Sequence, residues 1–299
     1  MTKTGHRDHP DPDVIVFHGG CWDGFASAMT AYRATVFGPL GQLPEPALVP
    51  AGYGTEPPDV TGKHVMICDF SYPPDVMAAV ADEAETLVWL DHHKTAIDRA
   101  DEWVHGADNL EYVVDSERSA ATITYDWFHP DAPGTPWPIR YIEDRDLWTK
   151  ALPDHEAVVT WIRSHDFTRS DWNAIRSTDL ETAVEEGQAM TRIRERLVSN
   201  VADQAFWADI DGNRVLLATA SYDIGSDVAD LLIRRSGHPV AGYVLINAHG
   251  EHQYGLRSVA GTDCSPIAVG RGGGGHAQAC GFRSGAPAHT HIEPAELWD

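Results

Sequence analysis

Three short apolar runs, separated by helix-like segments, constrain the fold of this chain most strongly. The runs cover residues 14–17, 63–70 and 86–91, and the segments 25–37 and 72–85 lie between them. Pro73 and Pro74 suit the first turn of the second segment. Strands that alternate with helices at this spacing favour a parallel, doubly wound sheet. We therefore expect an α/β fold for the N-terminal part of the chain.

Each of the three predicted strands ends in side chains that can bind a metal ion or transfer a proton. In chain order they are His18, Cys21, Asp23, Asp69, Asp91, His92 and His93. The carboxyl ends of neighbouring parallel strands open onto one crevice, so these side chains should meet there. Ions such as Mn²⁺ accept carboxylate and imidazole ligands together, and two such ions can clamp a phosphoryl group. Any one of these residues alone is typical of a polar strand end, but the whole set predicts a metal site.

The rest of the chain predicts two further parts. Residues 116–128 and 139–152 have helical periodicity, and residues 179–207 form a long, charged segment of the same period. Apolar strands follow at 214–219, 240–246 and 252–258, with a helix at about 225–236. We expect a catalytic domain over 14–178, a helical linker over 179–212 and a smaller α/β domain over 213–299.

A run of four glycines, residues 272–275, precedes His276 near the end of the chain. Glycines let backbone N–H groups approach an anion closely, and a helix N-terminus after the run would add its dipole. We expect a flexible phosphate-binding loop formed by Gly273, Gly274, Gly275 and His276, although a loop without a ligand fits the same pattern. Arg257, on the last predicted strand, can bind phosphate in a bidentate manner or be an exposed strand residue. Arg118 is a weaker candidate of the same kind.

The net charge of the chain limits the classes of molecule that it can bind. There are 45 acidic and 22 basic residues, a formal net charge of -23. This balance disfavours a protein that grips long duplex nucleic acid by neutralising phosphates. A small anionic substrate remains compatible, because bound cations reverse the local sign of the charge.

The cysteines and the apolar runs bear on the compartment. The four cysteines are widely spaced and form no C-x-x-C pair. The first thirteen residues are polar, lack an apolar signal core and are expected to form a disordered lead-in. No apolar run reaches the ~18–20 residues of a membrane span. We expect a cytoplasmic protein with reduced thiols and no membrane partner.

Five segments, in order, resemble the DHH phosphoesterase superfamily of the RecJ-like and short-oligonucleotide phosphodiesterase type. The first three are "FHGGCWDGFASA" (17–28), "ICDFSYPP" (67–74) and "LVWLDHHKTA" (87–96). The fourth and most loosely matched is "YIEDRDLW" (141–148). The fifth, "YGLRSVAGTDCSPIAVGRGGGGHAQACGF" (254–282), resembles the C-terminal domain associated with that family. Together the segments cover most of the chain from about Val14 to Phe282.

The resemblance implies a role for each matching residue. The implied metal ligands are His18, Asp23, Asp69, which would bridge two ions, His92, and Asp144 with Asp146 as the competing assignment. His93 would face the substrate phosphate or assist the leaving group. Asp91 would orient the histidine pair or touch a metal ion.

Cys21 departs from the family pattern. The first motif usually holds Asp-x-Asp, and here Cys21 stands at the first of those positions. A thiolate at this point can ligate a softer ion such as Zn²⁺, or the site lacks one carboxylate. Packing of Cys21 beside a tight turn is an equal alternative.

The activity implied by the resemblance is a divalent-metal-dependent phosphohydrolase with two Mn²⁺ ions per chain, Mg²⁺, Co²⁺ or Zn²⁺ being alternatives. The first expectation is a phosphodiesterase that acts on short oligonucleotides or dinucleotides through attack of a metal-activated water. Hydrolysis of phosphomonoesters, polyphosphate or pyrophosphate comes second. A non-catalytic nucleotide- or metal-binding protein on the same fold is the alternative from another class. The expected partner is a small anionic phosphate compound or a short single strand, and a homodimer stays open.

Overall fold

The computed structural model describes residues 2–3, 11–38, 44–52 and 54–295. The chain folds into two compact units, Met1–Met190 and Thr191–Asp299. The division falls within α8 (Leu180–Ala202), the long helix between the two sheets. Our expected boundaries at 178 and 212 bracket that point. The first half of α8 packs into a core of the first unit, through Leu180 and Ala183, and its last turns pack into a core of the second.

The first unit contains a sheet of five parallel strands. They are β2 (Val14–His18), β3 (Ala47–Ala51), β4 (His64–Cys68), β5 (Thr86–Asp91) and β6 (Leu110–Val114), in the spatial order β6-β5-β4-β2-β3. β1 (Thr2–Lys3) adds to β6 in the antiparallel direction, so the expected disordered lead-in is wrong for these two residues. Residues 4–10 of that segment lie outside the described residues.

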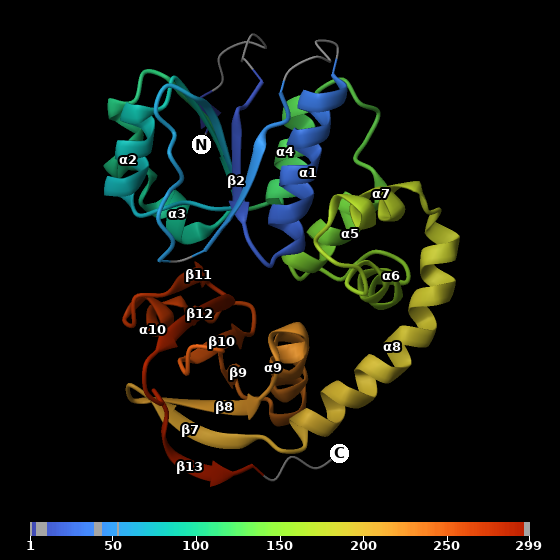
Figure 1. Ribbon diagram of the computed structural model, residues 1–299. Helices are drawn as coiled ribbons and strands as arrows, with labels where there is room; N and C mark the ends of the chain where they lie inside the picture. Colours follow the sequence, from blue (N-terminus) through green and yellow to red (C-terminus); the bar gives the residue numbers. More distant parts are fainter. Residues whose placement is uncertain (1, 4–10, 39–43, 53, 296–299) are drawn as a thin grey trace. The chain divides into compact units, whose positions relative to one another are not determined.

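Helices cover both faces of this sheet, as Figure 1 shows. On one face lie α1 (Trp22–Phe37), α4 (Ala120–Phe128), α5 (Trp137–Asp146), α6 (His155–Ile162) and α7 (Arg169–Ser177); on the other lie α2 (Pro74–Glu83) and α3 (Lys94–Asp98), with the 3₁₀ turns Ala100–Glu102 and Val104–Gly106. Alternate strand residues supply the two cores: Ile15 and Phe17 face the first set of helices, whereas Val14 and Val16 face the second. The predicted doubly wound α/β fold is confirmed.

The strand order contains a reversal between β2 and β4. From β2 the chain runs through α1 to β3 on one side, whereas β4 pairs with the opposite edge of β2 and leads through α2 to β5. Because α1 and α2 cover opposite faces, the carboxyl ends of β2 and β4 form a switch point of the kind at which open α/β sheets bind ligands. His18 ends β2 and Asp69 follows β4, so both residues lie at this switch point.

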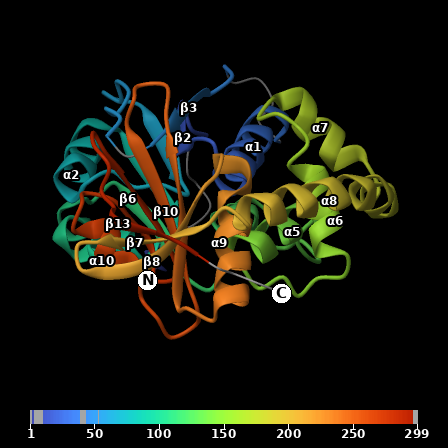
Figure 2. The ribbon, with the colours of Figure 1, turned by 90° about the horizontal axis from the view of Figure 1, so that it is seen from below.

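The second unit is a smaller α/β domain. Its sheet has the order β11-β12-β10-β9-β8-β7-β13. The strands are β7 (Phe206–Ile210), β8 (Asn213–Thr219), β9 (Val240–Ile246), β10 (His252–Ser258), β11 (Gly274–His276), β12 (Ala279–Ser284) and β13 (Thr290–Pro294). β8 and β9 pair in parallel, and the other neighbours pair antiparallel. α9 (Tyr222–Ser236) and α10 (Ser265–Val269) lie against opposite faces (Figure 2).

Several expected boundaries are corrected. The helix expected over 116–128 begins at Ala120, because the Ser119 side chain accepts a hydrogen bond from the Thr122 N–H and caps it. The helix expected over 139–152 spans Trp137–Asp146 and stops where Trp148 and Lys150 adopt positive φ angles. Among the described residues, no helix has the length and hydrophobicity needed to cross a membrane.

Candidate metal centre

Asp69 lies at the centre of the cluster at the carboxyl ends of β2, β4 and β5. Its φ angle of 56° places it in the left-handed region, which aspartate tolerates better than most residues. Its N–H donates to the Leu90 carbonyl at 2.9 Å, which ties this turn to β5. The carboxylate is only 1% exposed, and its Oδ2 lies 3.5 Å from His18 Nδ1. A buried carboxylate on a strained turn is typical of a functional position.

The Nε2 atom of His92 faces three carboxylates at once. It lies 3.1 Å from Asp69 Oδ1, 3.3 Å from Asp146 Oδ2 and 3.5 Å from Asp23 Oδ2. These acids come from the end of β4, the end of α5 and the first turn of α1. Residues distant in the sequence therefore converge on one imidazole nitrogen, as the strand-end argument predicts.

Asp91 holds the two histidines that follow it through hydrogen bonds. Its Oδ1 accepts hydrogen bonds from the backbone N–H groups of His92 and His93, at 2.7 and 3.1 Å. The same oxygen lies 2.8 Å from His93 Nδ1. Asp91 is fully buried, so these contacts fix both the turn and the ring of His93. These contacts orient the histidines, and Asp91 also forms a candidate ligand group with Asp69 and His93, so both roles left open by the sequence remain compatible with the structure.

Asp23 has a second task that the sequence did not reveal. Its two carboxylate oxygens accept hydrogen bonds from the N–H groups of Ala120 and Ala121, at 2.8 and 2.9 Å. Asp23 thus satisfies the N-terminus of α4, a helix about a hundred residues further along the chain, and the helix dipole favours its negative charge. No local pattern could predict this contact, because only the packing of α1 against α4 creates it.

Cys21, the residue before α1, lies in the cluster. Its sulfur, one ring nitrogen of His18 and an oxygen of Asp69 lie within 4.8 Å of one another. Burial raises the pKa of the Cys21 thiol well above its ordinary value, and the charges of Asp69 and Asp146 raise it further. In this surrounding the neutral thiol is the favoured form until a cation offsets the acids.

The two aspartates of the fourth motif, Asp144 and Asp146, have different partners. Asp146 points to His92, whereas Asp144 points away and accepts hydrogen bonds from the Thr149 hydroxyl, two backbone N–H groups and the His155 ring. Residues two apart on a helix do not face the same side, so only one of the pair can reach the cluster. The structure therefore brings Asp146 to the other candidate ligands and leaves Asp144 in a network of its own.

Electrostatics favour cation binding at this cluster. Burial raises the pKa of Asp23 well above its usual range, and Asp69 and Asp146 raise it further. Burial would also raise the pKa of Asp69, but hydrogen bonds from His18 and His92 hold it well below the usual range. In the described part of the chain, no lysine or arginine pairs with these carboxylates. Crowded acids with histidine as their positive partner fit a divalent cation.

The two candidate phosphate-binding arginines already have partners within the protein. Arg118 is already paired with Asp115 at 2.8 Å and with Asp126 at 3.0 Å, on the outside of the turn before α4. Arg257 lies on β10 in the second unit, where its guanidinium donates to Ser226 Oγ at 2.6 Å and to the Leu256 carbonyl at 2.8 Å. Its Nε is buried without an acceptor among the described residues.

The glycine run is not a free loop followed by a helix, as the sequence suggested. It enters the tight pairing of β11 with β12, which continues through His276. Gly273 allows close approach to the Gly281 carbonyl, which a Cβ atom would overlap, and its N–H donates to the Ala268 carbonyl at 2.9 Å. Gly275 has a φ angle of 133° that side chains rarely adopt. The backbone of this hairpin thus requires glycine at positions 273 and 275.

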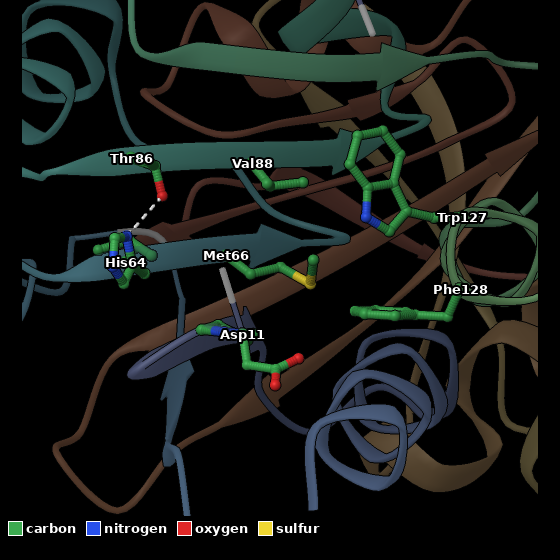
Figure 3. A pocket seen from close by; sticks show the side chains of 9 residues that line it. Asp11, His64, Met66, Thr86, Val88, Trp127 and Phe128 are labelled. Carbon is green, nitrogen blue, oxygen red and sulfur yellow. Dashed lines mark hydrogen bonds between the residues drawn. The ribbon is translucent and has the colours of Figure 1, made fainter. Parts of the chain in front are cut away.

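A cavity of about 30 Å³ lies at the opposite ends of the strands. Figure 3 shows it between His64 and Thr86, the first residues of β4 and β5, and Trp127 and Phe128 at the end of α4. It has room for a water molecule. Its position at the amino ends of the strands separates it from the cluster of acids and histidines.

Comparisons with known proteins give distant likenesses. No family model matches the chain. An uncharacterized protein of Acanthamoeba polyphaga mimivirus is 27% identical over 289 residues, which are 90% of this chain and 67% of the viral protein.

Two solved structures resemble the fold at low identity. A pGpG-specific phosphodiesterase from Vibrio cholerae has 10% identity and a TM-score of 0.45, over 90% of this chain and 92% of that one. An exopolyphosphatase-related protein from Bacteroides fragilis has 13% identity and a TM-score of 0.46, over 92% and 88%. At these scores the likenesses carry no argument about the activity of this chain.

Proposed function

We propose that this protein is a divalent-metal-dependent phosphohydrolase. The observation that carries the proposal is the convergence of Asp23, Asp69 and Asp146 on His92 Nε2, at 3.1–3.5 Å, at the point where the strand order reverses. Open α/β sheets bind ligands at such a point. Buried carboxylates and imidazoles without a lysine or arginine partner, among the described residues, form a donor set for cations rather than a structural ion-pair network.

The proposed ligands divide around the shared carboxylate of Asp69. Asp23, Asp146 and His92 lie on one side of it, and His18 lies on the other, with Cys21 nearby. When bound there, a pair of divalent cations supplies positive charge for a phosphoryl group and lowers the pKa of a bound water. Mn²⁺ is the first choice, because it accepts oxygen and nitrogen ligands together.

His93 is the proposed substrate-facing residue. The Asp91 carboxylate holds the ring through Nδ1 at 2.8 Å, which leaves Nε2 for the substrate. In the imidazolium form, with both nitrogens protonated, Nε2 would donate to a phosphate oxygen or to the leaving group. The same Asp91 oxygen is held by the two backbone N–H groups, so it presents a fixed acceptor to the ring. In the second unit, Arg257 and His276 are the proposed phosphate-binding residues.

The proposed substrate is a phosphodiester in a dinucleotide or another short oligonucleotide. The net charge of -23 opposes binding of a long polyanion, whose affinity depends on many phosphate contacts with lysine and arginine. Arg118, one of the few basic candidates, is occupied by two aspartates. A small substrate needs only the cations and a few donors.

A substrate panel tests this function. The full chain is assayed with Mn²⁺, Mg²⁺, Co²⁺ or Zn²⁺ against a linear dinucleotide, a cyclic dinucleotide, 3′-phosphoadenosine phosphate, pyrophosphate and a long single strand. We expect Mn²⁺-dependent release of mononucleotide from the linear dinucleotide at the highest kcat/KM. Faster release of phosphate from the monoester or pyrophosphate would instead favour a phosphatase or pyrophosphatase. Binding of nucleotide and metal without any product would support a binding protein.

Cys21 provides a prediction on metal preference. Cys21→Asp adds a hard oxygen ligand beside Asp69, so the Mn²⁺ concentration for half-maximal activity should fall by about tenfold. Cys21→Ser serves as the matched control, since it removes the sulfur without adding a charge. The measurement is a metal titration of activity with Mn²⁺ and, separately, with Zn²⁺. Unchanged titrations in both variants would reduce Cys21 to a packing residue; lower Zn²⁺ activity in both would show that the thiol serves a softer ion.

A further inference from the structure

Asp144, next to the candidate metal centre, is enclosed by donors that saturate its carboxylate. Oδ1 accepts from the Thr149 hydroxyl at 2.5 Å and from the Ala151 N–H at 2.8 Å. Oδ2 accepts from the Leu152 N–H at 3.2 Å and lies 2.5 Å from His155 Nδ1. Asp144 and His155 are 6% and 5% exposed. With both oxygens engaged twice, Asp144 is organised to hold protein groups rather than an ion.

Three of these donors belong to the segment between α5 and α6, and that segment has an unusual backbone. Trp148, Lys150 and Asp154 have φ angles of 59°, 49° and 53°, in the left-handed region. A non-glycine residue there is strained and persists only when its surroundings hold it. The Lys150 N–H also donates to the Asp144 carbonyl, at 3.2 Å. The segment thus winds around one buried side chain.

In the chain, Asp146 lies between Asp144 and the segment that follows α5. It is the last residue of α5, so its backbone carries no further helical turn to support it. Just beyond it, the Trp148 ring lies 4.1 Å from both the Arg145 guanidinium and the Lys150 ammonium group, which braces the chain on either side. A metal ligand must be held within about 0.5 Å of the position that binds the ion. The backbone that follows α5 must therefore have a fixed conformation.

We propose that Asp144 and His155 are positioning residues, which clamp the segment after α5 so that the Asp146 carboxylate faces His92. The inference rests on the proposed metal centre and assigns it a support outside the cluster. The carboxylate of Asp144 satisfies three donors in the segment, and His155, the first residue of α6, supplies the fourth. Loss of the clamp lets the end of α5 fray and moves Asp146 away from its 3.3 Å contact with His92.

The test measures metal affinity directly, by calorimetric titration of the metal-free full chain with Mn²⁺. Asp144→Asn places an amide N–H₂ where Oδ2 faces the Leu152 N–H and the His155 ring, so one side of the clamp is lost. We expect the Mn²⁺ affinity to weaken by about 10- to 100-fold, with the number of bound ions unchanged at saturation. Thr149→Val, which removes one donor and keeps the shape of the side chain, should weaken it by a smaller factor in the same direction.

Asp13→Asn is the matched control. Asp13 also accepts a backbone N–H, that of His64 at 2.9 Å, but at the amino ends of the strands. Circular dichroism and urea unfolding identify the conditions in which each variant is folded. A purely structural Asp144 would lower unfolding stability, as Asp13→Asn does, and leave the affinity of the folded protein unchanged; that result would overturn the inference alone. If the unaltered protein binds no divalent metal, both the proposed function and this inference are wrong.

Discussion

Replacing Asp69 by asparagine should remove most of the bound divalent metal and lower turnover by more than about a hundredfold. Residues that merely support a metal ligand are worth about 10- to 100-fold in affinity or activity, and Asp69 is the proposed carboxylate shared between two ions. Asparagine preserves the shape of the side chain and tolerates the left-handed φ angle of 56°. The change therefore removes charge without forcing the turn after β4 to rearrange.

Elemental analysis of the dialysed protein and steady-state kinetics on the dinucleotide provide the two readouts. Asp82→Asn, on the exposed side of α2, removes the same charge at a distance from the cluster and should change neither. If Asp69→Asn retains the metal content of the unaltered protein, Asp69 is not a shared ligand. Loss of metal with turnover intact would refute the dependence of the reaction on these ions.

Gly24→Ala should destabilise the first unit by about 1–3 kcal/mol, the usual cost of forcing an extra methyl group into a packed site. A Cβ atom at Gly24 would overlap the carbonyl oxygen of His18 and lie 3.0 Å from the His18 Cβ atom. Both obstacles are at the end of β2, close to its backbone, so no flexible side chain can move aside. The first turn of α1 must shift, and Asp23 shifts with it.

Urea unfolding and a Mn²⁺ titration measure the two consequences of this change. Gly52→Ala is the matched control: Gly52 follows β3 at the same edge of the sheet, and a Cβ atom there meets nothing within 4 Å. We expect the control to match the unaltered protein. Equal stability and equal metal affinity for Gly24→Ala would mean that α1 can withdraw from β2 at no cost to the site.

The sequence alone determined the architecture around the candidate centre. The runs at residues 14–17, 63–70 and 86–91 show the composition of buried strands, and the intervening segments show helical period, so local physics predicts the parallel order. Because parallel strands align their carboxyl ends, the meeting of His18, Asp69 and His92 follows from topology alone. The strands β1, β3 and β6 were missed, since pairing rather than a strong apolar pattern stabilises them.

Only the tertiary structure decided how neighbouring polar residues divide their tasks. Asp144 and Asp146 are chemically identical and two residues apart, and the point at which α5 ends sends one to a clamp and the other to His92. Asp23 caps α4 because α1 packs beside α4, and no local sequence pattern predicts this contact. The glycine run, which the sequence suggested as a mobile anion loop, is required by close backbone approach to β12. Composition and period specify which chemistry gathers at an edge, whereas packing and backbone conformation select which atoms face the site.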